Sequence, residues 1–322
     1  MVQTRLETVL ACPHCGTALQ SKDAGTAALK GELLEGELVC EKHHTFPVKD
    51  GIAAFCVPLK NKYEEEIFGQ FYLQTHYRDW IAKAASKDQL ATFDLPGFFT
   101  RGDSSYYTDL FTIFGGVLSK ASTVVDLGCS VGRLTFECAR HAGQVIGIDP
   151  SQLHIRHARD ILRTKELHVT LGQSQNAYAG EKTLTLHIPV MIPTRNVEFF
   201  VGDDASLPFA DASIDMIISS AVIDRVLDAE VFIRHCSRIL KPHGHILLTA
   251  PFNWQEIFTP PEKWLGKGGY GTPNGSPEKA LDALMKCHGY RRIRAQNIPW
   301  QTHCDQRYFF MWSIYAALFQ KI

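Results

Sequence analysis

The sequence predicts an α/β fold, in which buried strands alternate with helices, behind a small metal-binding module. Residues 123–128 form an apolar run that enters a glycine turn and then a helical pattern, and residues 145–149 form a second buried run. A strand, a glycine turn and a helix in this order are typical of parallel sheets that bind a ligand at their strand ends. Before them, residues 12–15 read CPHC and residues 40–44 read CEKHH, which predicts the metal module.

Length and charge limit the possible functions. With 322 residues, the chain can hold one large α/β domain and a small appendage. Its formal net charge of −1 provides no long-range attraction for nucleic acid or for an anionic membrane. The densest basic group is Arg291, Arg292 and Arg294, and its strand-like pattern predicts a solvated strand face.

The apolar stretches predict a cytoplasmic protein. Residues 1–10 lack the apolar core of a signal peptide. The longest apolar stretch, residues 309–319, is about half of the roughly 20 residues that a membrane span needs. In a reducing compartment, the nine cysteines are expected to be metal ligands or free thiols rather than disulfides.

The paired ligand sets predict one tetrahedral zinc ion. The expected ligands are Cys12, Cys15, Cys40 and His44, with His43 as the alternative fourth ligand. Four protein ligands leave no position for a catalytic water, so we expect a structural zinc that supplies much of the folding free energy of the module. The segments ACPHCGTAL and ELVCEKHHTFPVKDGIAAF resemble the Trm112-like zinc modules and the N-terminal zinc module of a bacterial 23S rRNA guanine methyltransferase. We place this module at residues 1–60 and the larger domain at residues 61–322.

The glycine turn and the acid after the second strand predict a nucleoside-containing ligand. Gly128 and Gly132 lack a Cβ, so their backbone can approach the ligand closely. Asp149 ends the second strand, where a carboxylate can accept hydrogen bonds from two ribose hydroxyls. Dehydrogenases that bind NAD share both features. Three later segments distinguish this chain from such dehydrogenases: VEFFVGDDASLPF at 197–209, SIDMIISS at 213–220 and LKPHGHIL at 240–247.

In this order, DLGCSVGR, GIDPS, GDDASLPF, SIDMIISS and LKPHGHIL resemble the motifs of class I S-adenosylmethionine-dependent methyltransferases. The resemblance implies a Rossmann-like fold, with a seven-stranded, mainly parallel sheet, helices on both faces and an antiparallel last strand. It also implies cofactor contacts by Asp149 at the ribose, by Asp203 at the adenine amino group, and by Asp126, Gly128 and Gly132 around the methionine moiety. Asp204 is the alternative at the adenine. Asp126 has the alternative role of bracing the glycine turn through backbone amides.

Further elements follow from the pattern. Helices are expected at residues 63–87, 106–119 and 275–288, and the last two strands at 290–297 and 307–321. Residues 93–105 are expected to be a loop. An insertion near residues 167–196 contains an alternating run that predicts a β-hairpin or flap beside the catalytic face. The aromatic segment 251–266 is compatible with a substrate loop and, equally, with a packed surface loop.

Extra segments resemble one subfamily. YLQTHY at 72–77, AVIDRV at 221–226 and the segment from FNW at 252–254 through WLG at 264–266 are similar to the ovothiol-pathway methyltransferases. That family methylates an imidazole nitrogen of 5-thiohistidine to give ovothiol A. The resemblance runs from about residue 63 to residue 319. It departs where His303 and Cys304 replace an Arg-Glu pair ahead of Arg307 and Phe309, so the substrate of this chain can differ.

Methyl transfer from a sulfonium needs mainly a positioned nucleophile. We expect Tyr77, Asp224 and Arg225 to grip the amino-acid end and the ring of a small substrate. His76 is either a proton acceptor or a packed histidine. Membrane and nucleic acid are not expected as partners. The alternatives are an rRNA or tRNA base methyltransferase, suggested by the zinc module, another small-molecule N-methyltransferase, and a module that docks a protein partner.

Overall fold

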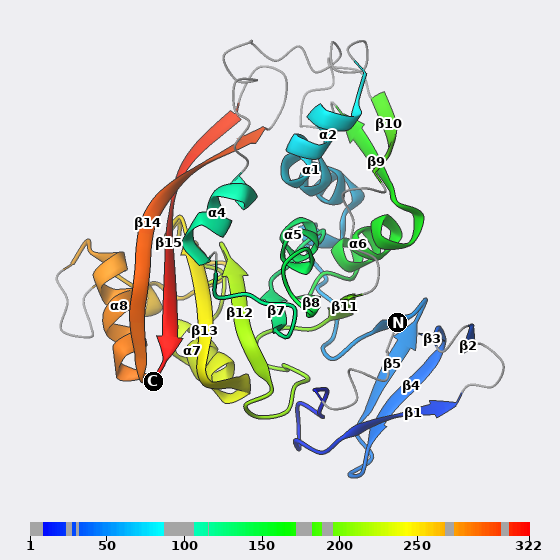
Figure 1. Cartoon of the computed structure of the whole chain (residues 1–322), viewed down its shortest axis with the longest axis horizontal. Coiled ribbons are helices and arrows are strands. Elements are labelled where there is room, and N and C mark those ends of the chain that lie inside the picture. Colours follow the sequence, from blue (N-terminus) through cyan, green and yellow to red (C-terminus); the bar gives the residue numbers. More distant parts are fainter. Residues whose placement is uncertain are drawn as a thin grey trace.

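The centre of the molecule is a seven-stranded sheet with the order β11-β8-β7-β12-β13-β15-β14 (Figure 1). The computed structural model describes residues 9–23, 28–29, 32–86, 106–114, 116–171, 182–188, 196–267, 274–303 and 309–322. The strands of the sheet are β7 (Thr123–Leu127), β8 (Gln144–Asp149), β11 (Val197–Val201), β12 (Ile214–Ser220), β13 (Leu240–Ala250), β14 (Tyr290–His303) and β15 (Phe309–Lys321). β15 is antiparallel to β13 and β14, and the other neighbours are parallel, which confirms the predicted topology.

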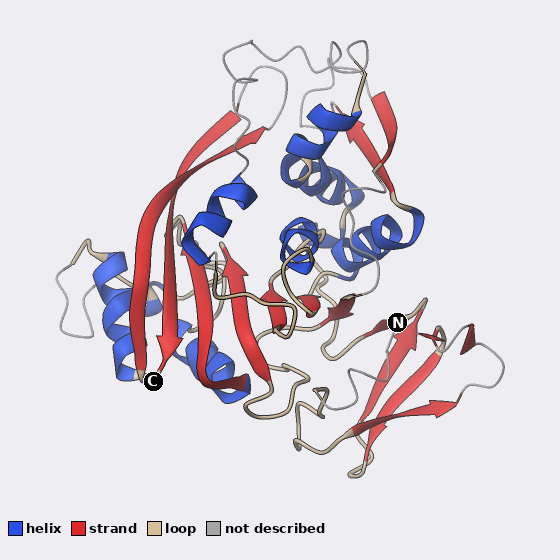
Figure 2. Ribbon diagram, viewed as in Figure 1, coloured by secondary structure: helices blue, strands red, loops and turns tan. Residues whose placement is uncertain are grey.

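Helices cover both faces of the sheet (Figure 2). Val124 and Val145 belong to one apolar cluster, whereas their chain neighbours Val125 and Ile146 belong to the other, because successive side chains of a strand point to opposite faces. The first cluster includes side chains of α1 (Glu66–His76), α2 (Arg78–Ala84), α4 (Tyr106–Phe114), α5 (Arg133–Ala139) and α6 (Gln152–Thr164). The second includes α7 (Ala229–Ile239) and α8 (Pro277–Cys287). The single helix expected over residues 63–87 is two, since Tyr77 separates α1 from α2.

The N-terminal module is a small antiparallel sheet with the order β1-β4-β5-β6. Its strands are β1 (Leu19–Asp23), β4 (Gly36–Cys40), β5 (Thr45–Lys49) and β6 (Ile52–Ala53), with a separate pair, β2 (Ala28–Leu29) and β3 (Glu32–Leu33). β5 alternates exposed and buried side chains, and its buried residues Phe46 and Val48 join the second cluster of the large domain. The module therefore shares an apolar core with the sheet.

The connection from β11 to β12 explains why the module can pack there. Residues 202–213 pass from one edge strand across β8 and β7, and no helix forms in them. Such crossings usually carry a helix that covers the sheet. Here the ring of Phe55 lies edge-on to Phe200 at 5.7 Å between centroids, and Leu10 forms a β-bridge to Phe209. The module thus covers the face that a crossover helix would cover.

The insertion contains the predicted hairpin. β9 (Glu166–Leu171) and β10 (Lys182–His187) pair antiparallel, while residues 172–181 and 189–195 lie outside the described residues. Leu167 and Leu186 are buried in the first cluster, and the Thr170 amide donates to Gln70 Oε1 of α1 at 2.8 Å. The hairpin therefore packs against α1.

Two sequence predictions concern the surface. Arg291, Arg292 and Arg294 are exposed on the edge strand β14, as expected for a solvated face. No helix among the described residues is both long enough and apolar enough to span a membrane. The predicted loop at 93–105 lies outside the described residues.

Phe55 gives a test of the shared core. Its side chain is 3% exposed and contacts the rings of Phe46 and Phe200. Phe55→Ala should lower the free energy of unfolding by about 3–5 kcal/mol, since it removes a buried ring from both parts. Urea unfolding of the full chain measures this. Val57→Ala, at a side chain that is 79% exposed, is the control and should change stability by less than about 0.5 kcal/mol. An equally small effect of Phe55→Ala would contradict the shared core.

Candidate functional site

The glycine turn lies at the carboxyl end of β7 and leads into α5. Gly128 and Gly132 both have a positive φ, +80° and +82°, which side-chain-bearing residues rarely adopt. A Cβ on Gly132 would lie 2.7 Å from Cζ of Phe199, so the turn also packs too closely to admit one. The turn is held from behind, since the amides of Gly128 and Cys129 both donate to the carbonyl of Ile148. Its shape therefore requires the glycines that the sequence places there.

Asp149 connects three segments at the end of β8. Its carboxylate accepts hydrogen bonds from the amide of Ser130 in the glycine turn and from the amide of Ser151, each at 2.9 Å. The two bonds use different oxygens, so each oxygen keeps a lone pair for a ligand. The side chain is 12% exposed. It can therefore hold the turn and still accept hydrogen bonds from a ribose.

Asp126 braces the turn. It is 1% exposed, and its Oδ2 accepts a hydrogen bond of 2.6 Å from the hydroxyl of Thr135 on α5. Burial raises the pKa of Asp126 to about 7. This geometry matches the bracing alternative, since the backbone of Thr135 hydrogen-bonds the carboxylate as well as its hydroxyl.

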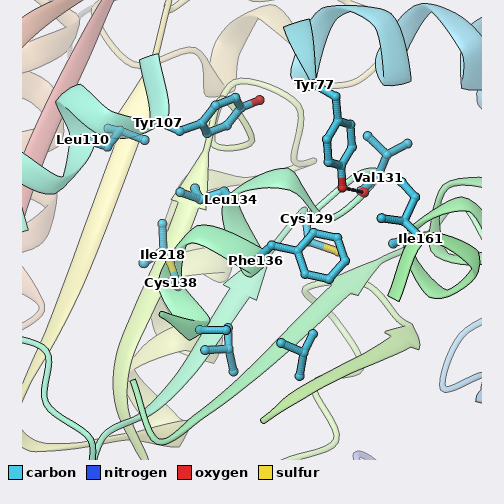
Figure 3. Packing of buried hydrophobic residues seen from close by; sticks show 14 of the residues in the cluster. Tyr77, Tyr107, Leu110, Cys129, Val131, Leu134, Phe136, Cys138, Ile161 and Ile218 are labelled. Atoms are coloured by element: carbon cyan, nitrogen blue, oxygen red, sulfur yellow. Dashed lines mark hydrogen bonds between the residues drawn. The ribbon is translucent and has the colours of Figure 1, made fainter. Parts of the chain in front are cut away.

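Tyr77 also supports the turn. It is fully buried, and its hydroxyl donates to the carbonyl of Val131 at 2.7 Å (Figure 3). Burial raises its pKa well above the usual value for a tyrosine. In contrast to the sequence prediction, Tyr77 lies behind the glycine turn, and its hydroxyl is bonded to a backbone carbonyl and not available for a substrate.

Asp203 and Asp204 follow β11 in a tight turn. Oδ1 of Asp203 accepts from the amide of Ala205 and from the hydroxyl of Ser206. The backbone carbonyl of Asp204 is 2.7 Å from Nδ1 of His235 on α7. Burial raises the pKa of the Asp204 carboxyl, with the charge of Asp203 as a second cause. Asp203 shapes the turn, and both acids remain candidates for an adenine contact.

The N-terminal module holds this turn from two sides. The Ala11 amide donates to Pro208 O at 3.0 Å after the turn, and the Phe55 amide donates to Val201 O at 2.8 Å before it. The chain then passes beside the acids of the site. Burial raises the pKa of the Cys56 thiol to about 12, and the charges of Asp203 and then Asp149 add to the effect, so Cys56 lies near both. This contact was not predicted from the sequence, because it joins residues that are about 150 positions apart in the chain.

Residues 57–62 lead from the module to a set of aromatic side chains that begins at Tyr63. The Leu59 amide donates to Pro150 O, and the Ser151 hydroxyl donates to the carbonyl of Tyr63 in the 3₁₀ helix η1 (Lys62–Glu64). Neighbouring ring centroids are 4.8–6.2 Å apart along the order Phe258, Tyr63, Tyr72, His76, Trp300 and Tyr106. We call these six residues the aromatic wall.

The aromatic wall is anchored at the strand ends. The Tyr106 hydroxyl is 2.8 Å from the hydroxyls of both Ser220, at the end of β12, and Thr249, near the end of β13. The wall therefore lies at the same edge of the sheet as the glycine turn and Asp149. Tyr63, Tyr106 and Trp300 could not be predicted as neighbours from the sequence, since they are distant in the chain and only the fold brings them together.

Buried polar atoms without a partner gather around the wall. Within the described residues, three such atoms belong to residues that contact the wall or the neighbouring Arg225: Tyr107 Oη, His154 Nε2 and Asp224 Oδ1. Buried polar groups are ordinarily hydrogen-bonded, so such a group of atoms indicates a site for a polar ligand.

Asp224 and Arg225 lie in the loop after β12. Asp224 is 0% exposed, and its Oδ2 accepts from the Asn253 amide at 2.9 Å. Burial raises its pKa. Nη1 of Arg225 is 3.3 Å from Asp224 Oδ2, and the guanidinium lies 5.5 Å from the ring centroid of Phe258. The structure thus brings the predicted acid and cation together beside the aromatic wall.

His76 is a packed histidine in the aromatic wall. Its ring contacts those of Tyr72, Tyr107 and Trp300. Burial lowers its pKa to about 3, and the charges of His154 and Arg133 lower it further. So weak a base is a poor proton acceptor near neutral pH, which favours the second of the two predicted roles.

Two side-chain hydrogen bonds hold part of the segment 251–266 in place. Nε1 of Trp264 donates to the Thr259 carbonyl, and the Thr259 hydroxyl donates to the Val226 carbonyl. Phe258, from the same segment, faces the aromatic wall. The segment is therefore in part a packed surface loop and in part a candidate substrate loop. Of the two residues at which the chain departs from the ovothiol family, Cys304 lies outside the described residues, as does the side chain of His303.

Cys12, Cys15, Cys40 and His44 converge in the module, with all four ligand atoms within 4.8 Å of one another. His44 Nδ1 is 3.4 Å from Cys12 Sγ and 3.3 Å from Cys40 Sγ, and Cys15 Sγ is 3.6 Å from Cys40 Sγ. Ligands around tetrahedral zinc are about 3.4–3.8 Å apart, as follows from the usual Zn–S and Zn–N bond lengths. The cluster therefore fits zinc. His43, the alternative ligand, is exposed and is not part of it.

Metal analysis tests the cluster. Purified protein should contain about one zinc per chain, and Cys12→Ser combined with Cys15→Ser should lose it, because two ligands cannot hold the ion. Cys287→Ser, at an exposed cysteine outside the cluster, is the control and should keep the metal. A folded wild type without metal would contradict the assignment.

Two family models match the chain. Residues 125–248 match the family described as "Methyltransferase domain", and residues 5–51 match the family described as "Trm112p-like protein". The first range spans the glycine turn, Asp149, Asp203 and Asp224, and the second spans the metal cluster.

Named relatives share part of the chain. It is 29% identical over 135 residues to a ubiquinone biosynthesis O-methyltransferase of Bradyrhizobium diazoefficiens, covering 42% of each chain. It is 26% identical over 139 residues to norajmaline N-methyltransferase of Rauvolfia serpentina, covering 43% of this chain and 39% of that enzyme. The chain thus spans less than half the length of these relatives. A crystal structure of a methyltransferase from Methanosarcina mazei is 21% identical and covers 65% of this chain and 96% of its own, with a TM-score of 0.44.

Proposed function

We propose that this chain, which carries a class I S-adenosylmethionine-dependent methyltransferase domain behind a Trm112-like module, methylates an imidazole nitrogen of 5-thiohistidine to form ovothiol A. The observation that carries the substrate class is the aromatic wall beside one buried carboxylate and one cation. A small zwitterion with a flat ring needs these three kinds of contact. We infer that Arg225 binds its carboxylate and that the free Oδ1 of Asp224 binds its amine.

The cofactor side of the proposal rests on Asp149 and the glycine turn. S-adenosylmethionine supplies a methyl group that is already activated on a sulfonium. The lone pairs that remain on Asp149 suit the ribose hydroxyls, and the narrow turn between Gly128 and Gly132 suits a ligand held close to the backbone. The unpaired polar atoms around the wall then belong to the second substrate. The two sites meet at the same edge of the sheet.

The role of the protein is mainly to orient the nucleophile. Positioning two reactants at near-attack distance contributes up to about 7–11 kcal/mol to lowering a barrier. Sulfur is the better intrinsic nucleophile of 5-thiohistidine, so the site must direct a ring nitrogen at the methyl group. The aromatic wall can fix the plane of the ring, while Asp224 and Arg225 fix its amino-acid end and so decide which ring atom faces the glycine turn.

Asp149 tests the cofactor side. Asp149→Asn removes charge-assisted hydrogen bonds worth about 1.5–3 kcal/mol, so the affinity for S-adenosylhomocysteine should fall on the order of 10- to 100-fold. Calorimetry measures the affinity, and thermal unfolding checks that the fold persists. Asp160→Asn, at a surface carboxylate paired with Arg163, should bind normally. If Asp149→Asn binds as tightly as wild type, Asp149 holds only the turn.

Turnover tests the substrate. The enzyme is incubated with S-adenosylmethionine and, separately, with 5-thiohistidine, histidine, ergothioneine or total RNA. Only 5-thiohistidine should be methylated, and the product should still react with a maleimide, because the thiol stays free. Phe258→Ala should raise KM more than it lowers kcat, since it removes one side of the ring-binding surface. Methylation of RNA alone would instead support a base methyltransferase, and a blocked thiol would mean that sulfur faces the methyl group.

A further inference from the structure

His154 lies where the glycine turn meets the aromatic wall. It occupies the first turn of α6, where its amide donates to the Ser151 hydroxyl that caps the helix. Its ring centroid is 4.7 Å from that of Tyr72 and 6.2 Å from that of Tyr63. Only 3% of the residue is exposed. A histidine is thus held between the proposed cofactor and substrate sites.

The two ring nitrogens of His154 have different surroundings. Nδ1 is 3.5 Å from the hydroxyl oxygen of Ser130 and 3.8 Å from Oδ1 of Asp149. Nε2 is buried and has no hydrogen-bond partner among the described residues. Oxygen acceptors beside Nδ1 favour the tautomer that carries its proton there. Nε2 then has a free lone pair, and a buried acceptor without a donor is unfavourable unless a ligand completes it.

The proposed reaction needs a proton acceptor at this place. A thiolate on the ring favours the protonated imidazolium, and a protonated ring nitrogen has no lone pair with which to attack. His76, the other histidine of the wall, is too weak a base. We propose that His154 is a catalytic residue, whose Nε2 accepts the proton of the ring nitrogen that becomes methylated. This inference rests on the proposed function.

The N–H bond of the substrate breaks and its proton moves to Nε2 of His154, leaving the electron pair on the ring nitrogen. That pair forms the bond to the methyl carbon of S-adenosylmethionine. The bond between this carbon and the sulfonium sulfur breaks, and its electrons go to that sulfur. The products are N-methylated substrate, S-adenosylhomocysteine and protonated His154. Asp149 stabilises the imidazolium, because its carboxylate lies beside Nδ1, and the proton later leaves to solvent.

Several charged and titratable groups surround His154. They are Asp149 on β8, Tyr63 and Glu64 on η1, Tyr72 and His76 on α1, His157 on α6 itself, and Arg225, whose charge reaches Tyr63 and Tyr72. A general base must carry no proton before it accepts one from the substrate. We therefore expect kcat/KM to fall on the acid side.

Kinetics with 5-thiohistidine test the role. His154→Gln should lower kcat by about 10²- to 10⁴-fold, the usual contribution of a general base, and should abolish the acid limb of the pH profile. Its affinity for S-adenosylhomocysteine should stay within about 3-fold of wild type. Imidazole added to His154→Ala should restore part of the activity. His157→Gln, on the same helix and beside Glu66, is the matched control and should behave as wild type. An unchanged pH profile with weakened cofactor binding would overturn the proposal.

A second readout needs no turnover. Nitrogen-15 NMR of the histidine rings in the S-adenosylhomocysteine complex, with His154→Gln for assignment, should show His154 at neutral pH with its proton on Nδ1. The opposite tautomer, with the proton on Nε2, would overturn the proposal, since that atom could not accept another. If wild type does not methylate 5-thiohistidine, the proposed function fails, and the tautomer still decides whether His154 can serve as a base.

Discussion

The carboxylate of Asp149 is the interaction on which the strand-end region depends. It binds the amide of Ser130 in the glycine turn and the amide of Ser151 at the start of α6. These bonds fix the turn, the helix and the strand relative to one another. The same carboxylate lies beside His154, and we propose that it also holds the ribose. A single group thus links the backbone geometry of the site to the proposed binding and proton transfer.

The helix-free connection between β11 and β12 gives the N-terminal module its place. Without a crossover helix, apolar side chains of β8 and β11 would face water, and Phe46 and Phe55 cover them instead. Hydrogen bonds from Ala11 and Phe55 hold both ends of the turn that contains Asp203. The module that holds the candidate zinc cluster is therefore connected directly to the turn that contains Asp203.

The partners of a side chain distinguish residues of the same type. Tyr77 and Tyr72 are separated by one helical turn and a half, yet Tyr77 is committed to the Val131 carbonyl while Tyr72 contributes a ring to the aromatic wall. His76 and His154 differ in the same way. The first is surrounded by rings that suppress its protonation, and the second has a carboxylate beside one nitrogen and nothing bonded to the other.

The sequence alone determined the sheet, the glycine turn, Asp149 and the metal cluster, because each depends on residues close in the chain: β-branched runs, glycines at positive φ, and paired cysteines on one turn. Only the tertiary structure decided the roles of Tyr77 and Asp126, since both depend on which partner the fold places against a buried polar atom. The aromatic wall unites η1, α1, α4, β14 and the segment after β13, which no local pattern connects. The role proposed for His154 could not be predicted from the sequence for the same reason. At the sequence level it is one more position on an amphipathic helix, and its chemistry arises from the turn and the aromatic rings that the fold packs around it.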